Sequence, residues 1–261
     1  MLLRNAKQLE GHALRARDGV IGQVKDFYFD DHHWHIRYCV VETGQWLQSR
    51  RVLISPEVMG DYDATLQVFP VDLTTEQVRT SPDVDTEKPV SRQHEQVLRQ
   101  HYGWPGYWEG VFGAGGLAAP IMTPTPAANT SEPGLTDEDL PLKKPGDPFL
   151  RSVNDTIGHH IEATDGAIGH AEDFLINDKD WRIRYLVIDT RNWWPGKKVI
   201  VAPEWIHNVN WENRRVVVDL TRDAIRKSPP YEPTMPLSEG YAAQLHEHYG
   251  RPRDEQRQRK R

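Results

Sequence analysis

Three closely spaced histidines, His32, His33 and His35, are the first feature of the chain that could do chemistry. Imidazole nitrogens bind zinc, and a turn leading into a strand could bring His33 and His35 to the same side. A related stretch further along the chain has no histidine at the corresponding positions, and the single cysteine, Cys39, lies in an apolar run typical of a buried thiol. We therefore expect an exposed polar turn that binds no metal, with contact to a partner as the remaining alternative.

Carboxylates are the second candidates, because they recur in pairs along the chain. The pairs are Asp26 and Asp173, Glu42 and Asp189, Glu57 and Glu204, and Asp72 and Asp219. A hydrolase would need two of them to converge in a cleft with perturbed pKa values. Their positions at turns, strand ends and helix starts favour structural roles, and Arg37 and Arg184 are the expected ion-pair partners of the first pair. No Ser-His-Asp or Cys-His pattern has a supporting context, so we predict no catalytic residue, no cofactor, no small-molecule substrate and no enzyme activity.

Tryptophans followed by basic pairs form the third group of candidates. Trp and Arg are the residues most enriched at binding hot spots. Two segments combine them, and the candidate partner-binding residues are Trp46, Arg50, Arg51, Trp193, Trp194, Lys197 and Lys198. The alternative is that one tryptophan packs down as a lid over the end of the core.

The elements that position these residues come from an internal repeat. DGVIGQVKDFYFDD, which starts at Asp18, returns as DGAIGHAEDFLIND, which starts 147 residues later at Asp165. Further segments recur with the same shift as far as HYGWP and HYGRP. A repeat of this length without insertions indicates duplication of a whole domain rather than a solenoid.

Each unit reads as a series of short strands with short helical appendages. Asp18-Gly19 and its counterpart are dipeptides typical of primed hairpin turns with positive φ. Gly22 lies inside an apolar strand pattern, which indicates a bulge or a sharp bend. The strand Trp34–Thr43 alternates at first and is then apolar on both faces at Cys39–Val41, so its outer face needs cover.

Helical segments follow the strands of each unit. Pro56 and Glu57 suit the first turn of a short helix. Thr74 stands three residues before Gln77, as in a capping box. The segments 91–102 and 238–249 have the apolar stripes of appended helices. We expect the outer faces of the strands to be covered by these appendages or by the opposite unit, in a pseudo-two-fold arrangement.

These residues carry a family resemblance. Asp-Gly, Ile-Gly and Asp-Phe follow one another in order, then Trp-x-Ile-Arg-Tyr and Pro-Glu, and the series occurs twice, over Gly11–Pro82 and Gly158–Pro229. This series resembles the PRC-barrel domain. The resemblance implies two small antiparallel β-barrels in a mainly β protein, and a binding or scaffolding role without catalytic residues.

Members of that family include the cytoplasmic domain of the photosynthetic reaction-centre H subunit and the C-terminal domain of a ribosome maturation factor. Three functions follow as expectations. The first is a scaffold that binds a protein partner or associates with itself. The second is an RNA- or ribosome-associated factor, favoured by the basic pairs and the C-terminal run of arginines. The third is an H-subunit-like accessory of a membrane complex that influences electron or proton transfer.

Composition sets the remaining expectations. The net charge of -6 gives no general attraction to nucleic acid. The N-terminus turns polar after three residues, and no apolar stretch approaches the ~20 residues of a membrane span, so we expect a bacterial cytoplasmic protein without a transmembrane segment. The predicted domains are 1–103 and 149–250, each with its helical appendage, joined by a Pro/Gly/Ala-rich linker at 104–148 and followed by a basic tail at 251–261.

Overall fold

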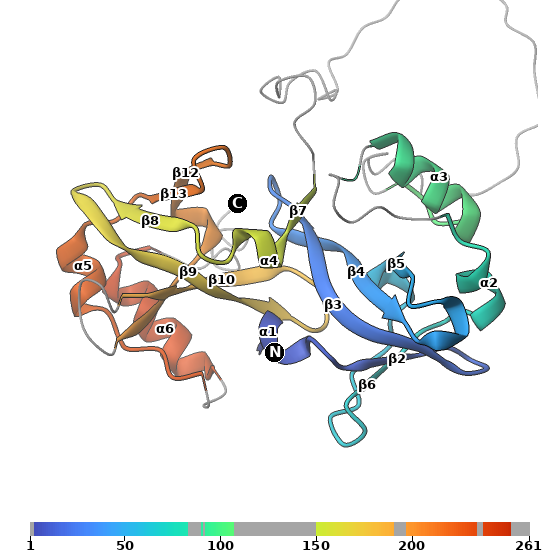
Figure 1. The fold of residues 1–261 in the computed structure, drawn as a ribbon. Helices are drawn as coiled ribbons and strands as arrows, with labels where there is room; N and C mark the ends of the chain where they lie inside the picture. Colours follow the sequence, from blue (N-terminus) through green and yellow to red (C-terminus); the bar gives the residue numbers. More distant parts are fainter. Residues whose placement is uncertain are drawn as a thin grey trace, which may run out of the picture. The chain divides into compact units, whose positions relative to one another are not determined.

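The computed structural model of the chain describes residues 3–82, 90, 92–106, 150–190, 197–233 and 237–251. The chain divides into two compact units, Met1–Pro89 with Leu150–Arg261, and Val90–Phe149. The first unit holds both copies of the repeat, and we call residues 3–82 the first repeat and residues 150–229 the second (Figure 1). In the second unit, helix α3 spans Arg92–Tyr102. Most of the predicted linker and of the basic tail lies outside the described residues.

Two sheets form the first unit, which confirms the prediction of a mainly β protein. The six-stranded sheet has the order β5 (Arg51–Ile54), β4 (His35–Thr43), β3 (Val20–Asp30), β2 (Ala13–Arg15) and β6 (Val68–Pro70), with β7 (Leu150–Ser152) paired to β3. The seven-stranded sheet has the order β11 (Lys198–Val201), β10 (Ile183–Asp189), β9 (Gly166–Asn177), β8 (His160–Ala163), β13 (Arg215–Val218) and β12 (Ile206–Asn210), with β1 (Leu3–Asn5) paired to β9.

The expected antiparallel pairing needs one correction in each sheet. Strand β2 pairs with β6 in parallel, and β8 pairs with β13 in parallel. Parallel neighbours require a long crossover connection, and here that connection contains the other strands of the sheet. Among the described strands, no pairing joins the two outer edges of either sheet, so closure of the barrels is not seen as a strand ladder.

Short helices accompany the strands of the first unit. They are α1 (Ala6–Leu9), α2 (Thr75–Arg79), α4 (Val153–Thr156), α5 (Arg222–Lys227) and α6 (Glu239–His248). Thr74 and Gln77 form the predicted capping box of α2. Helix α6 covers part of the second repeat, where His246 lies 5.1 Å from the ring of Trp205 and 6.3 Å from that of Tyr185.

The repeated glycine and aspartate residues have specific structural roles. The pairing of β2 with β3 shifts register between Gly22 and Val20, which confirms the predicted bulge. A Cβ atom on Gly22 would also lie 2.0 Å from the carbonyl oxygen of Glu42. The predicted primed turn is wrong, because neither Asp18 nor Gly19 has a positive φ. Asp18 instead accepts hydrogen bonds from the backbone N–H and the hydroxyl of Thr75, at 2.8 and 2.9 Å. The repeated aspartate therefore holds the start of a short helix.

The outer apolar faces are covered, as predicted. Cys39 and Val41 in β4, and Leu186 and Ile188 in β10, are fully buried. Burial raises the pKa of the Cys39 thiol, so this cysteine behaves as a small apolar residue.

The first strand of each repeat belongs to the sheet of the other repeat. Leu3–Asn5 pairs with Leu175–Asn177, and Leu150–Ser152 pairs with Tyr28–Asp30, so both pairings have the same register after the shift of the repeat. Figure 1 shows β7 and α4 beside β3, and α1 beside β9. The two repeats are thus intertwined within one compact unit.

Candidate interaction surface

The three histidines are spread over a turn and the start of β4. His33 Nδ1 lies 2.8 Å from Asp30 Oδ2, and His35 Nδ1 lies 2.9 Å from the carbonyl oxygen of Ile36. Within the described part of the chain, no group of three or more His, Cys, Asp or Glu side chains is placed to hold a metal. That these histidines bind no metal stays a prediction.

Asp30 is the carboxylate that organises this turn. It accepts hydrogen bonds from the Arg37 guanidinium at 2.8 Å and from the backbone of His32 at 2.9 Å. Burial would raise the pKa of Asp30, but the bonds from Arg37 and His33 outweigh it and lower the pKa to about 2. We expected ion pairs of Arg37 with Asp26 and of Arg184 with Asp173. In the structure, Arg37 donates to Asp30 and Arg184 donates to Asp180.

Asp26 and Asp173 accept hydrogen bonds from the first strand of the other repeat and from the short helix that follows it. The Ser152 hydroxyl and the Asn154 backbone N–H donate to Asp26 at 2.5 and 3.1 Å. The corresponding bonds to Asp173 come from Asn5 Nδ2 at 3.0 Å and the Lys7 backbone N–H at 3.2 Å. Each carboxylate therefore caps the first turn of a short helix from the other repeat.

Burial changes the protonation of these two carboxyl groups. It raises the pKa of Asp26 to about 6, although the Ser152 hydroxyl and the backbone N–H groups of Asn154 and Phe27 favour the charged form. Burial also raises the pKa of Asp173, for the same reason. Both groups are engaged in holding the fold together, so their perturbed pKa values have a structural explanation rather than a catalytic one.

Two tryptophans, buried Trp181 and half-buried Trp34, also connect the repeats. Trp34 and Trp181 occupy corresponding turns and have left-handed backbone conformations, with φ of 53° and 55°. That conformation is uncommon for a large residue, and here it directs each Trp carbonyl to the other repeat. Ile183 N–H donates to the oxygen of Trp34 at 2.8 Å, and Ile36 N–H to that of Trp181 at 2.9 Å.

The ring of Trp181 lies in the core of the first repeat. Its centroid is 6.2 Å from that of Phe27 and 5.7 Å from that of Phe69, and the residue is 6% exposed. Trp34 is half-buried; its ring stacks 5.3 Å from Phe29 of its own repeat and lies 6.5 Å from Phe174 of the second. Trp181 is thus inserted into the core of the other repeat, and Trp34 contacts the other repeat from a more exposed position.

Arginines of the exchanged strands complete these contacts. Arg4 Nε lies 3.0 Å from Asp178 Oδ2, and Arg151 Nε lies 3.0 Å from Asp31 Oδ2. These side chains are at most 19% exposed. Removal of only one member of either ion pair would therefore leave a buried charge without its partner and lower the stability. The Arg151 guanidinium also lies over the ring of Trp211, with Cζ 4.4 Å from the ring centroid.

Sequence reasoning missed the exchanged strands. The signal was present, because Leu3-Arg4 and Leu150-Arg151 are separated by the same 147 residues as Asp18 and Asp165. Nothing local in so short a segment indicates which strand it pairs with.

The predicted partner-binding residues do not all face solvent in the same way. The Arg50 guanidinium donates to the carbonyl oxygens of Val78 and Ser81, at 3.2 and 3.0 Å, and to the Ser81 hydroxyl at 2.8 Å. Lys197 likewise donates to the carbonyl oxygens of Arg226 and Ser228, both at 2.5 Å. The first member of each basic pair therefore caps the C-terminal end of a short helix.

Arg50→Ala is expected to lower the free energy of unfolding by about 1.5–3 kcal/mol, because it leaves the carbonyl groups at the end of α2 without a charged donor. Arg50→Lys should lose far less, since Lys197 fills this role in the second repeat. Urea unfolding of the two variants measures the difference, and equal stability of Arg50→Ala and the parent would refute the capping role.

Trp46 and Arg51 are the predicted partner-binding residues of the first repeat that remain accessible. Trp46 is 43% exposed, and its Nε1 donates to the carbonyl oxygen of Ile21 at 2.8 Å. The residue before Ile21, Val20, is 58% exposed. We call Val20, Trp46 and Arg51 the Trp46 surface. It combines an anchored aromatic ring with apolar area and a cation at one end of the first sheet.

The corresponding part of the second repeat is described only in part. Trp193 and Trp194 lie outside the described residues. Lys198, the counterpart of Arg51, forms an ion pair with Glu172 at 2.5 Å. Lys25 and Glu42 form a pair at 3.0 Å in the first repeat, so the charges at these strand positions are arranged differently in the two repeats.

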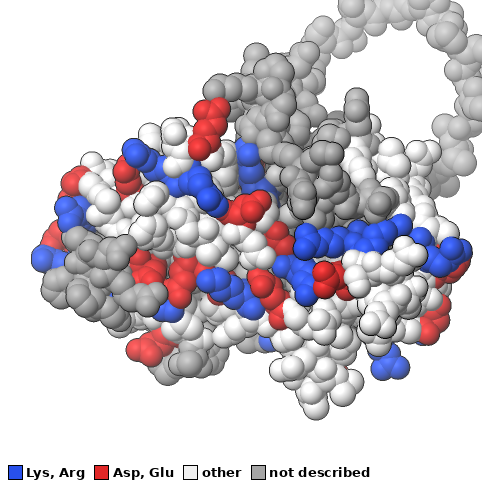
Figure 2. Space-filling model, in the orientation of Figure 1, with Lys and Arg blue, Asp and Glu red and all other residues white. Residues whose placement is uncertain are grey.

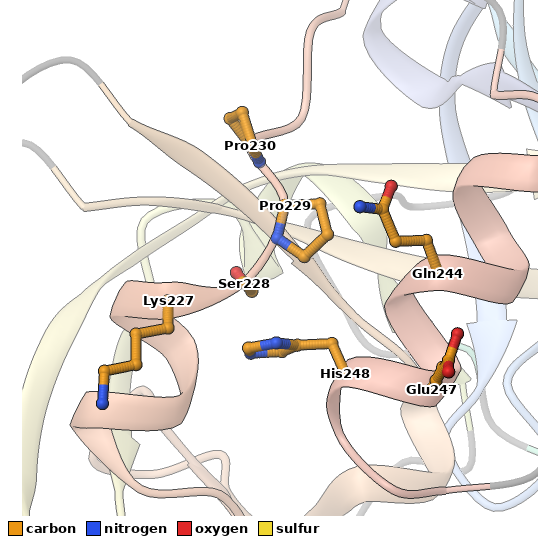
Figure 3. A pocket seen from close by; sticks show the side chains of 7 residues that line it. All are labelled: Lys227, Ser228, Pro229, Pro230, Gln244, Glu247 and His248. Carbon is orange, nitrogen blue, oxygen red and sulfur yellow. The ribbon is translucent and has the colours of Figure 1, made fainter.

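A second surface feature is an open hollow of about 360 Å³ between the end of α5 and α6. Figure 3 shows the His248 ring reaching from α6 toward the end of α5, where one ring nitrogen lies 2.8 Å from the carbonyl oxygen of Ala224. Lys227 at its rim pairs with Asp223 at 2.6 Å. The ion pair lies within α5, and the contact of His248 joins the two helices.

Acidic and basic side chains are interspersed on the face drawn in Figure 2. Among the described residues, none of the helices is both long and apolar enough to cross a membrane.

Comparison with known protein families gives a match within the second repeat. Residues 152–225 match the PRC-barrel domain family. The matched segment begins in β7, the exchanged strand, and ends in α5. No curated protein matches the sequence.

Proposed function

We propose that this protein is a non-catalytic scaffold built from two PRC-barrel modules, and that it binds a protein partner through the Trp46 surface. The family match covers the second repeat, and the sequence repeat extends the proposal to the first. The observation that carries it is the half-exposed ring of Trp46, held in place by its bond to Ile21 and set beside exposed Val20.

The chemistry of the surface indicates the kind of partner. A rigid indole with one edge in solvent supplies apolar contact area at low entropic cost, and Arg51 adds a cation beside it. This combination fits a partner with an apolar pocket and an acidic rim. Trp193, Trp194 and Lys198 extend the proposal to the second repeat.

A protein partner is favoured over nucleic acid. Nucleic-acid binding depends on a basic surface that neutralises several phosphates. On the face in Figure 2 the basic side chains are accompanied by acidic ones. Several basic side chains of the described residues form ion pairs, such as Arg17 with Asp72 at 2.5 Å.

Trp46→Ala is expected to weaken partner binding by about 2 kcal/mol or more, because it removes a hot-spot anchor. A photo-crosslinking amino acid at Gln45, the exposed neighbour of Trp46, identifies the partner in extracts of the native host, and the purified partner then gives the affinity of parent and variant. The same amino acid at Leu66, which is 65% exposed on another loop, is the matched control.

Stability separates this role from a lid over the core. If Trp46→Ala or Trp194→Ala unfolds well below the parent while binding the same partner with unchanged affinity, the tryptophan is a packing residue and the proposed surface is wrong.

A further inference from the structure

We propose that the surface between the two repeats is itself a recognition surface, whose partner is a repeat of the same design on a second copy of this chain. The observation is that each repeat is completed by residues of the other, through contacts that do not depend on how the repeats are connected. This inference involves other residues than the Trp46 surface and does not rest on it.

The exchanged strands provide the first part of the argument. Each pairing joins three residues of one repeat to three of the other. Strands this short have little stability of their own, so they need further contacts. The helices that follow them, α1 and α4, supply these contacts through the carboxylates Asp173 and Asp26.

The buried side chains provide the second part. Trp181 lies among aromatic residues of the first repeat, and Trp34 lies against Phe174 of the second. Arg151 and Arg4 pair with acids of the opposite repeat. A repeat without its partner would expose the space around Phe27 and Phe69 and leave Asp31 without Arg151.

Symmetry provides the third part. The strand pairings, the bonds from the helices to Asp173 and Asp26, the Trp carbonyl bonds and the Arg–Asp pairs each occur twice, with the roles of the repeats reversed, as in the two-fold interfaces of homodimers. The contact of Trp181 with Phe69 has no aromatic counterpart, because Val216 occupies the corresponding position. His35 and Arg182, which occupy corresponding positions, pair with each other, as residues on a two-fold axis do. The interface therefore recognises a repeat of its own kind.

Connection in one chain is not needed for any of these contacts. None of the residues named in these contacts lies between 83 and 149. A linker raises the effective concentration of the second repeat. A repeat from a second molecule can then take the place of the linked one whenever the linked one is released.

Cleavage of the folded chain tests the proposal. A protease site inserted within residues 110–145 of the full chain is cut after folding, and native mass spectrometry at micromolar concentration follows the products. We expect both fragments to remain in a 1:1 complex. After unfolding in urea and dilution, a mixture of isotope-labelled and unlabelled cut protein should give the two hybrid complexes in the same amounts as the parental ones.

Two results would overturn the proposal. The first is separation of the cut fragments under native conditions. The second is recovery of native complexes without hybrids, which would show that only fragments from one chain can pair. Neither experiment uses the unidentified partner, so failure here leaves the Trp46 surface untouched.

Variants connect the result to the interface. In the cut protein, Trp181→Ala is expected to raise the dissociation constant of the fragments by about a hundredfold or more, and Trp46→Ala should leave it unchanged. Arg151→Ala provides a second test if Trp181→Ala prevents folding of the uncut chain, which circular dichroism shows. Unchanged association in Arg151→Ala and in every folded Trp181→Ala sample would contradict the assignment.

Discussion

Trp181→Ala is expected to lower the free energy of unfolding of the whole unit by about 3–5 kcal/mol, the usual cost of removing a buried tryptophan. The ring is 6% exposed and lies against Phe27 and Phe69, so the cavity opens in the first repeat although the substitution is in the second. Urea unfolding monitored by circular dichroism measures the loss.

The control for this variant is Trp46→Ala. Because Trp46 is 43% exposed, its removal should cost only about 1–2 kcal/mol. Equal losses in the two variants, or greater amide exchange confined to the second repeat of Trp181→Ala, would show that the ring does not support the first repeat.

Asp26 is expected to make stability fall as the pH rises from about 4 to about 7. Its pKa is raised in the folded state to about 6 by burial, against an ordinary value of 3.8. A raised carboxyl pKa contributes stability that is fully present below the unfolded value and is lost as the pH passes the folded value. The expected loss is about 3 kcal/mol at most, and Asp173 acts in the same direction.

Asp26→Asn isolates this effect, because asparagine resembles the neutral carboxyl group in shape and charge. Urea unfolding gives the free energy of unfolding of the variant minus that of the parent. This difference should rise from pH 4.5 to 7 and stay constant at higher pH. The range excludes the titration of Asp30, whose pKa is about 2 and whose contribution is lost as the pH falls through that region. A difference that does not change with pH would contradict the raised pKa.

Local features of the fold were predictable from the sequence. Gly22 and its counterpart Gly169 were expected to mark a bulge or a sharp bend, and the strand pairing shifts register beside each of them. The capping box of Thr74 and Gln77 was also predicted. These predictions succeed because the interacting groups are strongly constrained by their immediate neighbours in sequence or in the sheet.

Long-range choices were not predictable in the same way. Asp18 binds Thr75 rather than forming a primed turn, and Arg37 binds Asp30 rather than Asp26. The exchange of the first strands depends on which of two similar sheets each strand joins. Since the repeats are alike in sequence, pairing within a repeat and pairing between repeats satisfy the same local pattern.

The candidate site was predicted in its residue types and only partly in their roles. The basic residue at Arg50 and Lys197 recurs because each helix end requires a cation, which explains the shared charge without a partner. Trp46 and Arg51 differ from Arg50 in their exposure to solvent. That exposure depends on the packing of α2 beside the strand, which the residue types do not reveal.

Hydrogen exchange in increasing urea tests most directly whether the two repeats form one intertwined unit. Mass spectrometry follows peptides from β3 (Val20–Asp30) and β9 (Gly166–Asn177) in the same sample. Because each sheet contains a strand and a tryptophan from the other repeat, both peptides should lose protection at the same urea concentration, in the parent and in Trp181→Ala. Two separate midpoints, with only one of them moved by the substitution, would contradict the account.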